Sequence, residues 1–352
     1  MDMKGDGMDR TARLAHWSII FGAASLFILV LYLSRPVTLP LAFGLFLMAI
    51  VWPVQDRLDR RFPRWVGFLT SVLLIVLAFG GFFGLLALSV ILIGDGIAAY
   101  RYELDRAYFS VLAWAAANGF PVNVPNVEEM DIGPMVGMAA SALDRVNASI
   151  ALIGLTFIYI VLGLLEVRDF GSKLRSLPTG DLILDAIQKI SHKFRRYIVV
   201  RTFVSLLTGL LTYLFALVLG LEFALTWGLI AFILNYIPFL GSILAVIPPV
   251  VFATVQFNDW LMPLLVLLGT STIQIVLGNY VDPRLEGRAL ALSPLVVVIS
   301  IFFWGMIWGV AGAFIGVPAT IAIITICDQF EQTQWLARLA GSRIPGKTKT
   351  KY

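Results

Sequence analysis

Polar side chains that could bind a solute or an ion are few in this sequence, and they gather between residues 235 and 288. Asn235, Gln274 and Asn279 stand within or at the ends of apolar runs. Polar groups inside a membrane span tend to face the interior of the helix bundle, where they mark solute or ion pathways. We therefore expect these three amides to offer hydrogen bonds to a small polar solute.

Asp282 and Glu286 are the candidates for a carboxylate that binds an ion or a proton. Asp282 lies three residues after Asn279 and would share a helix face with it if that helix continues. A second interpretation stays open, in which these carboxylates pair with Arg284 and Arg288 in an ordinary solvated loop. No Asp or Glu lies at the middle of a predicted span, which argues against a carboxylate-coupled pump unless this loop re-enters the membrane.

The sequence shows no arrangement typical of an enzyme or of a metal site. Its single cysteine, Cys327, excludes an intrachain disulfide and a cysteine-based metal site. The two histidines, His16 and His192, lie far apart and outside the apolar runs. There is no Ser/His/Asp set, no HExxH motif and no carboxylate pair within a span. We therefore expect no enzymatic activity, no cofactor and no metal.

The stretch from Gly341 to Thr348 fits the phosphate-loop pattern GxxxxGK[ST]. Such a loop needs a preceding strand and a following helix, whose N-terminus receives the phosphates. Here an amphipathic helix is predicted before the pattern, and only residues 349–352 follow it. We therefore expect no nucleotide site, and we interpret the Lys-rich end as a basic tail near anionic lipid.

Long apolar runs must position the polar groups. The chain of 352 residues is 59% hydrophobic and 14% charged, whereas soluble domains carry about 25% charged residues. Repeated apolar runs near 20 residues are typical of membrane spans. We therefore predict an all-α, polytopic membrane protein with about eight spans, at residues 15–33, 37–54, 66–94, 148–166, 201–220, 223–256, 260–280 and 294–326.

Two of these runs are too long for one straight crossing and contain helix-breaking residues. In hydrocarbon, a broken helix leaves backbone groups unpaired, so breaks survive only where protein or a watery cavity surrounds them. Transporters use such breaks to direct half-helix ends at a solute or an ion. We therefore predict a solute path at Asn235, Pro238, Phe239, Gly241 and Pro248 in the first run, and at Gly305, Gly309, Gly312 and Pro318 in the second. Whether 223–256 is one kinked span or a re-entrant hairpin stays open.

Glycines recur at small-xxx-small spacing in the last run, at Gly305-x3-Gly309 and Gly312-x3-Gly316. This spacing lets helix backbones approach closely, within one subunit or between subunits. A homo-oligomer is therefore compatible with the sequence, and the number of subunits is not determined by it.

Lys and Arg gather in the loops 55–65 and 167–200 and in the C-terminal tail, whereas 95–147 is richer in Asp and Glu. The positive-inside rule then places both termini in the cytoplasm of a multi-pass inner-membrane protein. The net charge of +4 follows from the same bias, so we expect membrane lipid and not nucleic acid as a partner.

We divide the chain into four parts on this basis. Residues 1–94 hold the first three spans, 95–147 form an extracytoplasmic helical segment, 148–327 form a core of spans four to eight, and 328–352 form a basic tail. Within the core, residues 167–200 are a basic cytoplasmic linker. Apolar residues recur at helical spacing from 181 to 199, which indicates an amphipathic helix in the headgroup region or packed on the cytoplasmic ends of other spans.

Several different short motifs occur in the second half of the chain. They are Phe194-Arg-Arg-Tyr197, the span 203–220, Asn235-Tyr-Ile-Pro-Phe-Leu-Gly241, Ile247-Pro-Pro249, Asn279-Tyr-Val-Asp-Pro283, Leu292-Ser-Pro-Leu295, and the block from Trp304-Gly through Trp308-Gly-Val-Ala-Gly312 to Val317-Pro318. Together they resemble the AI-2E family of transporters, the autoinducer-2 exporter family. The resemblance is strongest over 150–328 and covers 1–100 in layout only.

The resemblance implies an inner-membrane permease of about eight spans, associated with small signalling molecules such as autoinducer-2, and some relatives are linked to sodium/proton exchange. We therefore expect a transporter or exporter of a small polar solute. Two alternatives stay open. One is a sodium or lithium/proton antiporter that uses Asp282 or Glu286, and the other is a non-transporting membrane scaffold that docks through 95–147.

Overall fold

The protein is an assembly of helices. The computed structural model describes residues 18–100 except 20 and 24, single positions between 102 and 119, and residues 133–257, 259–286 and 292–341. Within these residues the chain forms helices and no strand, so the predicted all-α class is confirmed. The helices are α2 (Arg35–Asp59), α3 (Arg64–Ala99), α5 (Gly133–Arg175), α6 (Gly180–Val218), α7 (Ala224–Leu234), α8 (Leu240–Gln256), α9 (Leu261–Val276), the π-helix η2 (Leu277–Val281), α10 (Asp282–Glu286), α11 (Pro294–Cys327) and α12 (Gln334–Ala340).

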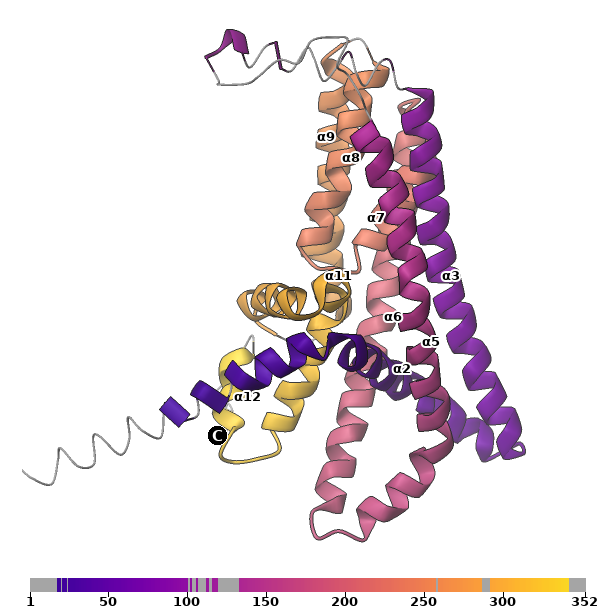
Figure 1. Ribbon diagram of the computed structural model, residues 1–352, viewed down its shortest axis with the longest axis vertical. Coiled ribbons are helices and arrows are strands. Elements are labelled where there is room, and N and C mark those ends of the chain that lie inside the picture. The colour runs from indigo at the N-terminus through magenta and orange to yellow at the C-terminus, as the bar shows by residue number, and fades with distance from the viewer. Residues whose placement is uncertain are drawn as a thin grey trace, which may run out of the picture.

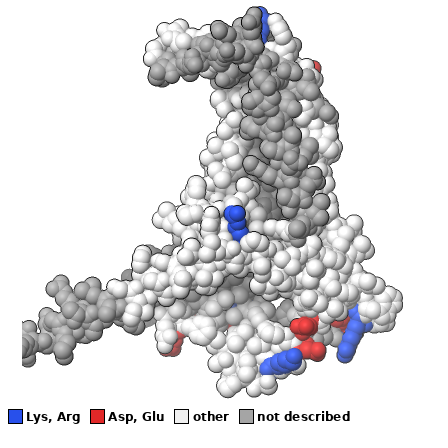
Figure 2. Space-filling view, in the orientation of Figure 1, with Lys and Arg blue, Asp and Glu red and all other residues white. Residues whose placement is uncertain are grey.

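Apolar helices lie within each of the predicted spans, although not all of them are long enough to cross a membrane. Among the described residues, five helical stretches are long and apolar enough to cross a membrane, namely Arg35–Asp59, Arg64–Gly94, Gly180–Val218, Leu261–Val281 and Pro294–Cys327. Shorter apolar helices cover Phe21–Leu33, Leu152–Val167, Ala224–Leu234 and Leu240–Gln256. On the face of the molecule that Figure 2 shows, most of the visible charged side chains lie at the lower end, and the middle is almost free of them. The polytopic membrane class is thereby confirmed, while the side of each terminus stays a prediction.

Three long helices, α3, α5 and α6, form the frame of the molecule (Figure 1). The helix α5 begins at Gly133, so the predicted boundary at residue 147 falls inside a continuous helix. The helix α6 is likewise continuous and includes the whole predicted amphipathic stretch 181–199. This part of α6 packs on α2, where the Ser191 hydroxyl donates to the Ala49 carbonyl and the rings of Phe46 and Phe194 lie 5.0 Å apart. The stretch therefore packs against other helices in this structure.

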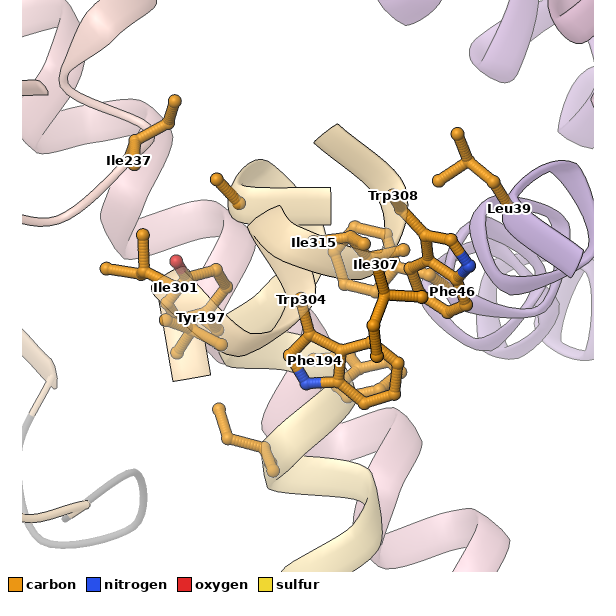
Figure 3. Packing of buried hydrophobic residues seen from close by; sticks show 13 residues of the cluster. Leu39, Phe46, Phe194, Tyr197, Ile237, Ile301, Trp304, Ile307, Trp308 and Ile315 are labelled. Atoms are coloured by element: carbon orange, nitrogen blue, oxygen red, sulfur yellow. The ribbon is translucent and has the colours of Figure 1, made fainter. Parts of the chain in front are cut away.

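The main hydrophobic core lies where α2, α6 and α11 meet. Figure 3 shows Leu39 and Phe46 of α2, Phe194 of α6, and Trp304 and Trp308 of α11 gathered in this cluster. The two indole rings lie 4.6 Å apart, and Trp308 donates from Nε1 to Thr38 Oγ1 of α2 over 3.3 Å. Buried aromatic side chains contribute much of the packing energy of such a core, so this cluster ties α11 to the frame.

The run 223–256 is two helices separated by a break. Figure 1 shows α7 and α8 side by side, so the segment folds back as a hairpin in the upper half of the molecule. At the break, the Leu240 N–H donates to the Pro238 carbonyl over 2.6 Å across Phe239, whose φ of 60° and ψ of −58° form a γ-turn with positive φ. This is the rarer, strained form of the γ-turn. The structure thus favours the re-entrant hairpin over a single kinked span.

The long helix α11 also folds back on itself. Its backbone breaks at Gly309, where φ is 69° and ψ is −152°, a conformation essentially restricted to glycine. The Ser300 hydroxyl of the first arm donates to the Gly316 carbonyl of the second arm over 2.7 Å. Gly312 lies so close to Trp304 that a Cβ atom there would overlap the Trp304 carbonyl oxygen. Gly312 and Gly316 are therefore used for close packing within the chain, whereas Gly305 and Gly309 make no such close contact. A homo-oligomer stays a prediction.

Parts of some predicted segments lie outside the described residues. They are most of 101–132 in the predicted extracytoplasmic segment, residues 287–291 in the charged loop, and residues 342–352, which include most of the phosphate-loop-like pattern. Their predicted roles stay predictions.

The close approach at Gly312 leads to a stability prediction. We expect Gly312→Ala to destabilise the protein by about 1–3 kcal/mol, the usual cost of overpacking, because the added methyl group must push the two arms of α11 apart. The matched control is Gly305→Ala, where the added Cβ would meet only the Ala313 methyl at 3.6 Å. Thermal unfolding of both variants in detergent checks this. Equal melting temperatures for the two variants would contradict the close packing of the arms.

Candidate functional site

A row of polar side chains runs along one face of α6. Arg201, Ser205, Thr208 and Thr212 follow one another at spacings of four, three and four residues, which places them on a single helix face. All four are buried. We call this row the polar seam. Buried polar groups within an apolar span are costly unless they are paired, and they commonly mark a solute or ion pathway.

Two glycines bring α7 against the polar seam. A Cβ atom on either Gly209 of α6 or Gly228 of α7 would lie 2.8 Å from the carbonyl oxygen of the other, so the two backbones touch there. The helix α9 also packs on α6 and buries Thr270 and Gln274, which lie one turn apart. The seam therefore faces α7, while α9 packs on the same helix.

The break between α7 and α8 directs two polar side chains at α6. Asn235 is buried and donates from Nδ2 to Ser205 Oγ over 3.0 Å. The Tyr236 hydroxyl donates to Thr202 Oγ1 over 2.9 Å. Both residues follow directly after Leu234, the last residue of α7, so the break orients both side chains toward α6. The predicted site at Asn235 thus coincides with the middle of the polar seam.

A buried ion pair lies at one end of the polar seam. Arg201 Nη1 and Asp282 Oδ2 are 2.9 Å apart, and their side chains are only 6% and 10% exposed. The Arg201 guanidinium also lies 5.6 Å from the centre of the Tyr197 ring. Among the described residues, the second oxygen of Asp282, Oδ1, has no hydrogen-bond partner. One acceptor at this end is therefore available to a donor group.

Asp282 reaches this position because the regular helix is interrupted just before it. The π-helix η2 (Leu277–Val281) separates α9 from α10, and such π-turns occur frequently at functional sites. Asp282 lies just beyond the apolar segment Leu261–Val281. Burial raises the pKa of its carboxyl, while the charge of Arg201 acts in the opposite direction.

The structure brings some of the predicted site residues together and separates others. Asn235, Gln274 and Asp282 are buried, whereas Asn279 is exposed. Asn279 and Asp282 therefore do not share a face, because η2 changes the helical period between them. Arg284 is exposed, and among the described residues Asp282 forms its ion pair with Arg201.

The remaining predicted residues belong to the two breaks. Pro238 and Gly241 are buried at the first break, Phe239 is exposed there, and Pro248 is half-buried within α8. Gly305, Gly309, Gly312 and Pro318 all lie in α11.

Sequence reasoning missed the α6 side of the site. Arg201, Ser205 and their neighbours Thr208 and Thr212 were not expected to take part, although their helical spacing was visible in the sequence. The signal was a single arginine at the start of an apolar run, followed by hydroxyl residues on the same face. Its partner Asp282 is 81 positions further along the chain, and no local pattern connects the two.

The ion pair leads to a prediction about stability. We expect Arg201→Met or Asp282→Leu alone to destabilise the protein by about 3–5 kcal/mol, because each leaves one charge buried without its partner. The double variant should recover most of that loss, since it removes both charges. Thermal unfolding of the two single variants and the double variant checks this. Additive losses in the double variant would show that the two side chains are energetically independent.

Comparisons with known proteins agree with this architecture. Residues 21–332 match the family model of the AI-2E family transporters. The "AI-2 transport protein TqsA" of Escherichia coli is 30% identical over 309 residues, which are 87% of this chain and 90% of that protein. A "Putative transport protein" of Borreliella burgdorferi is 28% identical over 89% of this chain and 87% of its own length. The "Putative transport protein YhhT" of Escherichia coli is 26% identical over 95% of this chain and 96% of its own length. A chain with these helices and this match over most of its length belongs to the AI-2E family of membrane transporters.

Proposed function

We propose that the protein moves a small polar solute across the cell membrane along the polar seam. The observation that carries the proposal is the buried contact of Asn235 with Ser205 at the helix break. A break within a membrane helix persists where it lines a cavity or is surrounded by protein. Here it presents an amide to a row of hydroxyl groups, which offers a solute both donors and acceptors.

The charged side chains along the seam compensate each other, so a solute bound there would be recognised mainly by hydrogen bonds. Arg201 and Asp282 form an ion pair and compensate each other. The other polar side chains of the seam are the hydroxyls of Ser205, Thr208 and Thr212, and the amide of Asn235 contacts Ser205; α9, which also packs on α6, buries Thr270 and Gln274. A small molecule with several hydroxyl or carbonyl groups matches this set, because each group on the molecule finds a partner of the opposite kind.

The name of one relative suggests a first solute to test. TqsA of Escherichia coli is named an AI-2 transport protein, and AI-2 is a signalling molecule. We therefore place AI-2 first in a panel of small polar solutes for this chain.

Transport by purified protein in proteoliposomes tests the proposal. We expect Asn235→Ala and Gln274→Ala to lower the initial rate of solute efflux by about tenfold, the loss that corresponds to one hydrogen bond of about 1.4 kcal/mol. Asn279→Ala is the matched control, because this asparagine is exposed and we expect it to keep the wild-type rate.

The outcomes of this assay are distinct. Equal rates in the Asn235 and Asn279 variants would place the solute path elsewhere in the protein. If no solute of the panel moves in the wild-type protein, the transport proposal loses its support and a scaffold role gains it. Incorporation of each variant into the vesicles is measured in parallel, so that a folding defect is recognised.

Exchange of sodium or lithium for protons is a second candidate function. The observation that favours it is Asp282, a buried carboxyl with one oxygen that has no hydrogen-bond partner among the described residues. A pKa raised by burial brings the carboxyl closer to the range in which it would take up and release protons. Arg201 must then release Asp282 when a cation binds, because the guanidinium competes for the same charge.

A gradient experiment decides between the two candidates. If the chain is an antiporter, an imposed sodium gradient should drive proton movement in proteoliposomes, and Asp282→Asn should abolish it. Glu222→Gln, which changes an exposed carboxylate elsewhere in the chain, is the control and should retain wild-type exchange. Proton movement that persists in the Asp282 variant would remove this carboxyl from the mechanism.

A further inference from the structure

Four aromatic rings from four separate parts of the chain meet beside the first break. Phe314 of the second α11 arm lies 5.3 Å from Tyr236, 5.5 Å from Phe82 of α3 and 6.3 Å from Phe43 of α2, measured between ring centres. Phe82 also lies 5.6 Å from Tyr236. We call these four residues the aromatic cluster. It is the place where the α7–α8 hairpin contacts the α11 hairpin.

Tyr236 belongs both to this cluster and to the surroundings of the polar seam. Its ring stacks on Phe314 with an interplanar angle of 21°, while its hydroxyl donates to Thr202 of α6. Asn235, the preceding residue, contacts Ser205 of the seam. The aromatic cluster therefore borders the polar seam directly, with apolar rings on one side of Tyr236 and hydrogen-bonding groups on the other.

The cluster differs from a closed hydrophobic core. In the nearby core, Phe46 and Phe194 are 4% and 6% exposed. In the cluster, Phe43, Phe82 and Phe314 are half-buried, whereas Tyr236 is 7% exposed. Phe43 and Phe314 also pack against the main core, and the accessible part of these rings borders open space or lipid.

Unusual backbone conformations lie close to both hairpin residues of the cluster. Phe239 has a positive φ three residues after Tyr236, and Gly309 adopts its glycine-only conformation five residues before Phe314. A positive φ at a residue with a side chain, such as Phe239, costs about 1–3 kcal/mol, whereas glycine adopts the Gly309 conformation without this cost because it has no Cβ atom. Gly309, which is exposed, is therefore the position about which the α11 hairpin could move.

We propose that the aromatic cluster is an ion-excluding barrier across the solute path, closed by the contact of Tyr236 with Phe314. The inference rests on the proposed function, since a barrier requires a path. An apolar constriction stops ions because water withdraws from it and an ion cannot pass without its hydration shell. Movement of the α11 hairpin about Gly309 would withdraw Phe314 from Tyr236 and open the path to the solute.

A leak measurement tests the barrier without any knowledge of the solute. Purified protein is placed in proteoliposomes that contain a pH-sensitive dye, and a potassium diffusion potential drives protons inward. We expect Phe314→Ala to raise the initial rate of proton entry several-fold over the wild-type protein. Phe314→Leu should stay close to wild type, because a leucine side chain retains an apolar obstruction at the same position.

Phe302→Ala is the matched control for this experiment. Phe302 lies in the first arm of the same helix, is 61% exposed and is not among the ring contacts of the cluster. We expect this variant to be as ion-tight as the wild-type protein. Phe82→Ala serves as a second variant if Phe314→Ala fails to fold, because Phe82 contacts both hairpins from α3. It should also leak.

The results separate this inference from the proposed function. Leaky Phe314 or Phe82 variants beside a tight Phe302 variant support the barrier, even if no solute of the panel is transported by the wild-type protein. Folded variants at Phe314 and Phe82 that are as tight as wild type would overturn it. A leak of the same size in the Phe302 variant would also overturn it, because the effect would then be general loosening of α11.

Discussion

Backbone hydrogen bonding is the constraint on which this structure depends. In hydrocarbon, no water is present to bind a free N–H or C=O group, so a helix can be interrupted only where protein encloses the interruption. The break at residues 235–239 meets this condition, because it is enclosed by α6 and α11. Gly309 is instead exposed at the tip of the α11 hairpin, whose two arms are joined by the hydrogen bond from Ser300 to Gly316. Glycines let the helices pack closely, because Gly209, Gly228 and Gly312 allow backbones to touch. The arrangement of the second half of the chain follows from these contacts.

The two hairpins give the molecule one polar and one apolar region side by side. The α7–α8 hairpin presents Asn235 to the hydroxyl groups of α6. The α11 hairpin brings Phe314 against Tyr236. A transporter needs both kinds of surface, because a polar solute must find hydrogen-bonding partners while ions and water are kept from passing freely. The close placement of the two regions is consistent with membership of a transporter family.

The ion pair of Arg201 with Asp282 connects this region to α10. An isolated charge in an apolar environment is costly, and pairing reduces the cost without creating a net charge along the seam. The pair also connects α6 to the end of α9, where the π-helix interrupts the regular backbone. A connection of this kind can hold one conformation of the protein and be released when a ligand binds to either partner, because each charge then finds another group of opposite sign.

The sequence by itself determined the membrane class, the position of the apolar helices and the existence of two breaks, because these depend on local composition and on local helix breakers such as Pro238 and Gly309. It also indicated Asn235, Gln274 and Asp282 as candidate site residues, since polar groups in apolar runs are visible one residue at a time. Only the tertiary structure decided that the breaks are hairpins, that Asp282 pairs with Arg201 and that Asn279 is exposed. Those outcomes depend on which helix faces meet. The contact of Gly209 with Gly228 and the change of helical period in η2 cannot be recognised in the local sequence pattern. The pattern therefore could not show which helix faces meet.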